Sequence, residues 1–164
     1  MGTHRHHSPV ARPARAFALA LLLSLAGACG DDSPLAPQRA ELAAARARWT
    51  SARPASNSYT MEQRVSCFCV TGATNFEVTV AAGTIVRARS LETGVEMRSA
   101  QFTMFRAVDQ LFEEIRLALG VPGTLNSVEF DPATGYPTTV ALDPIKQAVD
   151  DEVTYVTRHL TFVP

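Results

Sequence analysis

The segment from Asn126 to Asp143 constrains the fold most, because two alternating apolar and polar stretches flank a turn motif there. The apolar positions of this alternation are Val128, Phe130, Val140 and Leu142. Between them, the side chain of Asp131 can cap a turn, Pro132 presets φ at about −65°, and Gly135 can adopt a positive φ. Pro137 lacks an N–H and is typical of the first residue of a return strand. The segment therefore predicts a β-hairpin.

Three more strands and a short helix are expected before this hairpin. Alternation predicts a strand from Tyr59 to Val70, whose core face carries Tyr59, Met61, Val65, Cys67 and Cys69 and whose other face carries Thr60, Glu62, Arg64 and Ser66. Phe76, Val78 and Val80 repeat the alternation, and a tight turn at Ala82-Gly83 leads into a strand from Thr84 to Arg89. From Arg39 to Ser51 the composition favours helix, with an apolar stripe at Leu42, Ala45 and Trp49.

A longer helix and a final strand complete the pattern. Apolar residues recur at helical spacing at Phe105, Val108, Phe112, Ile115 and Leu119. Thr103 is available as the N-cap, and Gly120 with Pro122 ends the helix. Val153 to Val163 is expected to be a strand with Val156, Leu160 and Phe162 on one face. The fold class predicted is α+β: a mostly antiparallel sheet of five to six strands with one or two helices on one face.

The N-terminal segment predicts export and lipidation. Arg5, Arg12 and Arg15 precede an apolar run of 13 residues, 16–28, which is shorter than the roughly 20 residues that cross a bilayer as a helix. The run ends in the sequence LAGAC, which resembles the bacterial lipobox, so Cys29 is expected to carry diacylglycerol. We therefore expect a lipoprotein signal peptide at 1–28, a flexible tether at 29–38 and a single domain at 39–164. A plain secretory signal is the alternative.

Charge excludes one class of partner. Removal of residues 1–28 takes away three of the fifteen basic residues and none of the sixteen acidic ones, which leaves twelve against sixteen, a formal net charge of −4. Nucleic acid is therefore not an expected partner. The histidines His4, His6 and His7 are lost with the signal, so they are not expected to bind a metal.

Several of these features together resemble a known family. They are Tyr59, the Cys67-Phe68-Cys69 triplet, Val78 and Val80 before Gly83, residues 108–112, Phe130-Asp131, Gly135-Tyr136-Pro137 and Asp143. This set resembles family 6174 of the domains of unknown function, found in bacterial secreted lipoproteins, over about Trp49 to His159. The resemblance implies fold kinship and an envelope location. It implies no catalytic residues, because the family has no established activity.

The Cys67-Phe68-Cys69 triplet is the motif with the most chemistry. An exported protein with two cysteines besides a lipidated one is expected to oxidise them. Two strand rises of about 3.3 Å place the two Cα atoms near the upper limit for a disulfide, so a bulge or strand end is needed. We expect a local disulfide or two buried thiols. A redox pair is the alternative, and a metal site formed with His159 is a third interpretation.

Other motifs indicate no cofactor. The sequence has no Gly-rich phosphate loop, no G-x-S-x-G and no H-E-x-x-H. An acidic group suggests a calcium site, although such a group is more often a solvated turn; its members are Asp131, Asp143, Asp150, Asp151 and Glu152. The hairpin set Asp131, Gly135, Tyr136, Pro137 and Asp143 is a candidate binding surface.

We therefore expect a lipid-anchored envelope protein with a non-catalytic binding or structural domain. Its expected partners are the membrane, through the lipid on Cys29, and an envelope protein. A thiol-disulfide redox protein and a hydrolase or metal-dependent enzyme are the alternatives from other classes.

Overall fold

The structure is a computed structural model that describes residues 1–2, 33–67, 74–145, 148 and 150–163. The helices and strands within these ranges belong to the unit Asp32–Pro164. No helix in the described part of the chain has the length and apolarity needed to cross a bilayer.

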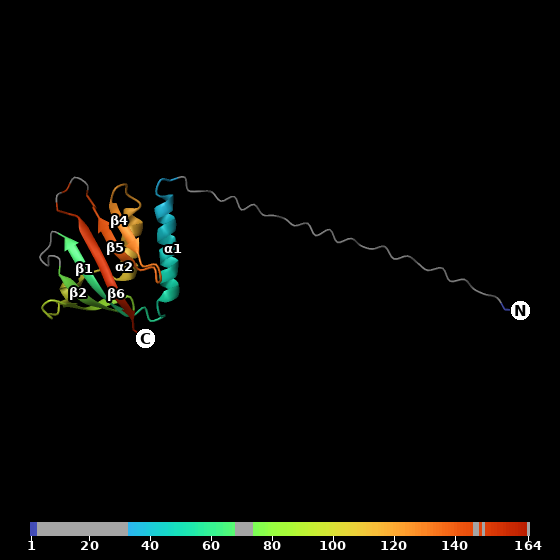
Figure 1. Ribbon diagram of the computed structural model, residues 1–164, viewed down its shortest axis with the longest axis horizontal. Helices are drawn as coiled ribbons and strands as arrows, with labels where there is room; N and C mark the ends of the chain where they lie inside the picture. Colours follow the sequence, from blue (N-terminus) through green and yellow to red (C-terminus); the bar gives the residue numbers. More distant parts are fainter. Residues whose placement is uncertain (3–32, 68–73, 146–147, 149, 164) are drawn as a thin grey trace. The chain divides into compact units, whose positions relative to one another are not determined.

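A six-stranded antiparallel sheet forms the described domain (Figure 1). Its strands are β1 (Tyr59–Cys67), β2 (Asn75–Ala81), β3 (Thr84–Ser90), β4 (Leu125–Phe130), β5 (Pro137–Leu142) and β6 (Val153–Phe162). Their order in the sheet is β3-β2-β1-β6-β5-β4. The first and last strands, β1 and β6, are therefore neighbours at the centre of the sheet. On one side of this pair lie β2 and β3, and on the other lie β5 and β4, so each half of the sheet consists of consecutive strands. The predicted α+β class and the predicted hairpin are confirmed.

Helix α1 (Ala36–Ala52) is held to the domain by the residues of its predicted apolar stripe. Leu42, Ala45 and Trp49 are buried, as expected from their spacing. The Trp49 ring meets the Tyr59 ring edge-on at 5.4 Å between centroids. Its indole Nε1 donates to Asp109 Oδ1 at 3.1 Å, so this buried aromatic also satisfies its polar atom. The helix begins three residues earlier than expected, and residues 36–38 of the predicted tether are helical.

Helix α2 (Val108–Ala118) covers the same sheet face and supplies much of the core. The Val108 N–H donates to the Tyr59 hydroxyl at 2.8 Å. Phe112 is fully buried and its ring stacks on Phe130 of β4, with 6.1 Å between centroids. Among the described elements, no helix lies on the opposite sheet face (Figure 1). That face carries the polar residues that alternate with the buried ones on β1, among them Glu62 and Arg64. Such one-sided burial is common in antiparallel sheets.

The start of α2 differs from the prediction that Thr103 is its N-cap. Thr103 lies in a separate 3₁₀ helix, η1 (Ser99–Met104), and the N-cap of α2 is Ala107. The backbone is extended between these elements, which lets Arg106 pass close to the sheet. Gln110 Oε1 accepts from the Ala107 N–H at 2.8 Å. The Thr103 prediction was wrong because this extended stretch interrupts the helical periodicity.

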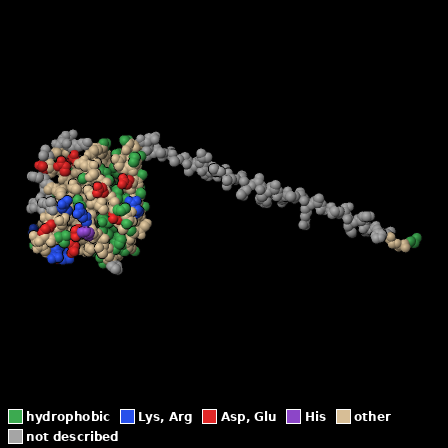
Figure 2. Space-filling view, in the orientation of Figure 1, with side chains coloured by type: hydrophobic (Ala, Val, Ile, Leu, Met, Phe, Trp, Pro, Cys, Tyr) green, Lys and Arg blue, Asp and Glu red, His purple; other side chains and the backbone are tan. Residues whose placement is uncertain are grey.

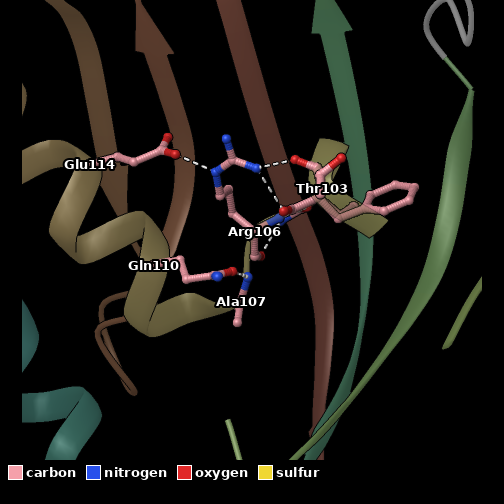
Figure 3. A network of polar contacts seen from close by, with 7 residues as sticks. Thr103, Arg106, Ala107, Gln110 and Glu114 are labelled. Carbon is pink, nitrogen blue, oxygen red and sulfur yellow. Dashed lines mark hydrogen bonds and ion pairs between the residues drawn. The ribbon is translucent and has the colours of Figure 1, made fainter. Parts of the chain in front are cut away.

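The Arg106 side chain ties this junction together (Figure 3). Its Nε donates to Glu114 on α2, and its Nη1 donates to the Thr103 carbonyl at 2.5 Å and to the Phe105 carbonyl at 2.9 Å. Its guanidinium lies 5.5 Å from the centre of the Tyr155 ring on β6. One arginine thus joins η1, α2 and the sheet.

Because β6 contains a bulge, its residues do not all lie on the sheet faces predicted for them. The β1–β6 register shifts between Thr60 and Glu62, and His159 adopts a left-handed φ of 49°. Tyr155 and Thr157 are buried before the bulge, whereas Leu160 and Phe162 pack on the core after it. The extra residue reverses the alternation. Val156, predicted to share a face with Leu160 and Phe162, instead lies opposite Arg64 on the uncovered face.

Candidate functional site

The hairpin turn singled out from the sequence is organised by Asp131. Its Oδ1 accepts from the Ala133 N–H at 3.1 Å and from the Thr134 N–H and Oγ1 at 2.7 Å each. Partial burial alone would raise the pKa of Asp131, but the hydrogen bonds from Thr134 and Ala133 bring it below its ordinary value. The carboxylate therefore has a turn-forming role.

Gly135 seats the hairpin turn against helix α1. Its φ is +81°, and an added Cβ would lie 2.2 Å from the Ala45 carbonyl oxygen and 2.9 Å from Arg48 Cβ. A side chain at this position would therefore collide with the helix backbone. Pro137 is the first residue of β5, as predicted, and it is buried. Asp143 directly follows the last residue of β5, and its N–H donates to the Thr124 carbonyl at 2.8 Å. The predicted set thus lies at the two ends of β5.

Tyr136 is the member of that set that faces a hollow. This hollow has a volume of about 370 Å³ and lies beside β5 and β6 at the end of their ladder, where the last pair is Thr139 with Val156. It is lined by Tyr136 and by Glu129, Thr138, Thr139, Val156, Thr157, Arg158 and His159. Its lining includes Thr139 and Arg158 from the uncovered face and Tyr136 and Thr157 from the core side. Burial, and secondarily the charge of Asp131, raises the pKa of Tyr136, so its phenol is neutral at pH 7 and can both donate and accept.

His159 enters this hollow from the β6 bulge. Its Nδ1 lies 2.9 Å from Glu62 Oε1 on β1, and its side chain is 75% exposed. The contact with Glu62 orients the imidazole and leaves the other ring nitrogen available. Nearby, the Thr139 hydroxyl donates to Glu129 Oε2 at 3.3 Å. Hydroxyl, phenol, imidazole and guanidinium groups therefore line one hollow, a set that recognises polar and anionic ligands by hydrogen bonding.

A second, smaller hollow of about 110 Å³ adjoins the first. Its lining is Glu62, Arg64, Asn75, Val156 and Arg158, and it shares Val156 and Arg158 with its neighbour. We name the two hollows together the open-face site. Basic, acidic and histidine side chains lie close together on this side of the molecule (Figure 2). One row across four strands contains Arg89, Glu77, Glu62 and Arg158.

Two hollows on the helical side of the sheet are lined by arginines that already contact other groups of the protein. One of about 440 Å³ lies between α1 and α2 and includes Arg46, which lies 6.0 Å from the Phe112 ring centre, and Arg116, which is bound to Glu113 at 2.5 Å. Another of about 440 Å³ is lined by Arg106, whose contacts with Glu114 and the backbone are described above. The open-face site differs, because Arg64 and Arg158 have no ion-pair partner among the described residues.

The cysteine predictions fall mainly outside the described residues. Cys29 and Cys69 both lie there, while Cys67 ends β1 and is half-buried. The bridge between Cys67 and Cys69 and the lipidation of Cys29 therefore stay predictions. Within the described ranges, no group of three or more His, Cys, Asp or Glu residues is placed to hold a metal ion.

The strands that form the open-face site lie within the part of the chain that matches a protein-family model. The model of the Family of unknown function (DUF6174) matches residues 41–162. The chain belongs to DUF6174. The comparisons found no match among curated proteins and none among solved structures. The DUF6174 match begins within α1 and ends at the last residue of β6, so it includes the complete described sheet, all of α2 and α1 from residue 41 onward. The family resemblance drawn from the sequence motifs is confirmed.

Within the DUF6174 domain, Tyr136 was predicted from the sequence as a binding residue, and His159 was considered only as a metal ligand. Arg64 and Glu62 were assigned to the outer face of a strand, which is correct, but no role was attached to them. Arg158 and His159 follow in a strand whose local alternation is interrupted by the bulge. An isolated Arg-His pair in a strand carries little signal by itself. Arg158 and His159 become part of a site only because β6 pairs with β1, which carries Glu62 and Arg64.

Proposed function

We propose that this chain is a lipid-anchored cell-envelope protein whose DUF6174 domain binds a partner or ligand at the open-face site without catalysing a reaction. The anchoring part is supported by the series of basic, apolar and small residues that ends at Cys29. The binding part is supported by the convergence of Tyr136, Arg158 and His159 on one hollow at the end of the β5–β6 ladder.

That convergence is the observation that carries the binding proposal. An uncovered face is usual for an antiparallel sheet and indicates nothing alone. Here, however, a half-buried neutral phenol lies beside an exposed arginine and a histidine that is oriented by Glu62. Aromatic and arginine side chains are enriched at the centres of binding interfaces, because they combine large contact area with several hydrogen bonds.

The anchor is tested by mass spectrometry of the mature N-terminus. We expect a chain that begins at Cys29 and carries the added mass of diacylglycerol. A mature chain with an unmodified Cys29, or one that begins elsewhere, would remove the anchoring part of the proposal.

The binding face is tested by placing a photo-reactive residue at Thr139, on the open-face site, and at Leu117, which is 56% exposed on α2. In envelopes of the producing cells, we expect a cross-linked product from the Thr139 position and none from Leu117. Introducing Tyr136→Ala into the Thr139 chain should abolish the product. Equal products from both positions, or one insensitive to Tyr136→Ala, would contradict binding at this face.

A further inference from the structure

Two arginines on neighbouring strands share the smaller hollow of the open-face site. Across the β1–β6 pair, Arg64 lies opposite Val156, and Glu62 lies opposite Arg158. Arg64 and Arg158 are therefore diagonal neighbours on one face, a spacing of roughly 7 to 8 Å that long side chains can bridge. Both line the hollow of about 110 Å³.

Neither guanidinium has a hydrogen-bond or ion-pair partner among the described residues, and Arg64 Nε is also shielded from solvent. A shielded guanidinium N–H without an acceptor is unfavourable, because it has lost water and gained nothing in return. The guanidinium group presents N–H donors in a planar fork that matches two oxygens of a carboxylate or phosphate. This pair of side chains therefore lacks acceptor oxygens.

The acidic residues around this pair are already engaged by other groups. Glu62 contacts His159 Nδ1 at 2.9 Å, and Glu77 contacts Arg87 Nη1 at 3.5 Å. Glu92 accepts from the Asn75 backbone N–H at 3.0 Å and from Asn75 Nδ2 at 3.1 Å. The smaller hollow is lined by two guanidinium groups and one carboxylate, that of Glu62, so its lining carries an excess of one positive charge.

We propose that Arg64 and Arg158 bind an oxyanion, a carboxylate or a phosphate, that belongs to the ligand of the open-face site. The adjoining hollow of about 370 Å³ supplies Tyr136 and the threonines of β5 for the rest of that ligand. Hydroxyl and phenol groups suit a polar body with hydrogen-bonding atoms. The ligand class is thus an anionic group attached to a polar body, and the inference rests on the proposed binding role of this face.

An NMR titration of the arginine Nε–H signals of the purified chain tests this inference. Inorganic phosphate and acetate serve as separate probes, and chloride keeps the ionic strength constant. We expect the Arg64 and Arg158 signals to shift and saturate with at least one probe. A response to phosphate alone indicates a phosphate-bearing ligand, a response to acetate alone indicates a carboxylate, and a response to both indicates an oxyanion site that does not discriminate.

Variants assign the response to these two side chains. Arg64→Gln and Arg158→Gln should each raise the Kd for the responding probe about tenfold or more, as expected when a hydrogen bond to a charged group is lost. Arg158 is exposed, so its replacement leaves the core intact. Arg87→Gln is the matched control, because Arg87 lies on the same face but is bound to Glu96 at 2.7 Å and to Glu77. The control should leave Kd unchanged.

The outcomes separate this inference from the proposed function. Shifts that chloride reproduces, or that survive both Arg64→Gln and Arg158→Gln, would overturn the oxyanion site. A partner cross-linked at Thr139 without a response to either probe would overturn this inference and keep the proposed function. A saturable response without any cross-linked partner would keep the oxyanion site and count against a protein partner.

Discussion

The side-chain amide of Gln63 hydrogen-bonds both backbone polar groups of Arg106. Its Oε1 accepts from the Arg106 N–H at 2.9 Å, and its Nε2 donates to the Arg106 carbonyl at 2.9 Å. Gln63 is fully buried on β1, and its Nε2 also lies 3.3 Å from Thr157 Oγ1 on β6. The Gln63 side chain thus makes the two backbone hydrogen bonds with Arg106 that a neighbouring strand would otherwise make.

Gln63→Leu should lower the free energy of unfolding by about 2 to 4 kcal/mol, because it keeps the side-chain volume but leaves two backbone groups without partners. Urea unfolding followed by circular dichroism measures the loss. Gln38→Leu, on the exposed first turn of α1, is the control and should change stability by less than about 0.5 kcal/mol. A loss below about 1 kcal/mol for Gln63→Leu would show that the amide is dispensable.

Gly135→Ala should destabilise the domain by at least about 2 to 3 kcal/mol, since it adds a collision with Ala45 to the strain of a positive φ. Gly94→Ala is a matched control. Gly94 has a similar φ of +72°, but its added Cβ meets the flexible end of Arg89 at 3.1 Å. The excess loss at Gly135, measured in parallel urea unfolding, isolates the contact with α1. Equal losses would mean that the hairpin can move away from the helix.

Phe112→Ala should cost about 3 to 5 kcal/mol, because the ring is fully buried and the variant leaves a cavity in the core. Leu117→Ala on the same helix should cost far less, since Leu117 is 56% exposed. Chemical denaturation of the two variants compares a core position with a surface position. A small loss at Phe112 would contradict the observed packing of α2.

Asp131 should make part of the stability depend on pH. Its pKa in the folded protein is below the unfolded value of about 3.9, so its contribution is present above that value and is lost as the pH falls through the folded pKa. Asp131→Ala should cost about 1 kcal/mol at neutral pH, as for a lost side-chain cap. Urea unfolding of both proteins should show this difference narrowing below about pH 4. A difference that is constant with pH would rule out the ionised carboxylate as its source.

Local sequence patterns determine most of the secondary structure. Phe76, Val78 and Val80 are buried as their alternation predicts. Ala82 and Gly83 both adopt positive φ, 49° and 77°, which suits the tight turn expected between β2 and β3. These features depend on neighbours within a few residues, so the sequence is sufficient to predict them.

Features that depend on distant residues were not predicted. The burial of Gln63 requires Arg106 and Thr157 as partners, and they lie 43 and 94 residues away. The bulge at His159 changes which side chains of β6 face the core, and a strict two-residue period cannot register an inserted residue. The same holds for the open-face site, since Arg64 and Arg158 become neighbours only through the pairing of β1 with β6.

The central position of the β1–β6 pair also sets the order in which the sheet can assemble. Strands β1 to β3 can form one antiparallel ribbon and β4 with β5 another, because each uses contacts close in sequence. The two ribbons have no shared sheet until Val153–Phe162 is free to lie between them. The complete sheet therefore forms only when β6 pairs with β1 on one side and with β5 on the other. Until then, β1 and β5 are open sheet edges with unpaired backbone N–H and C=O groups, at which a strand of another chain could pair instead.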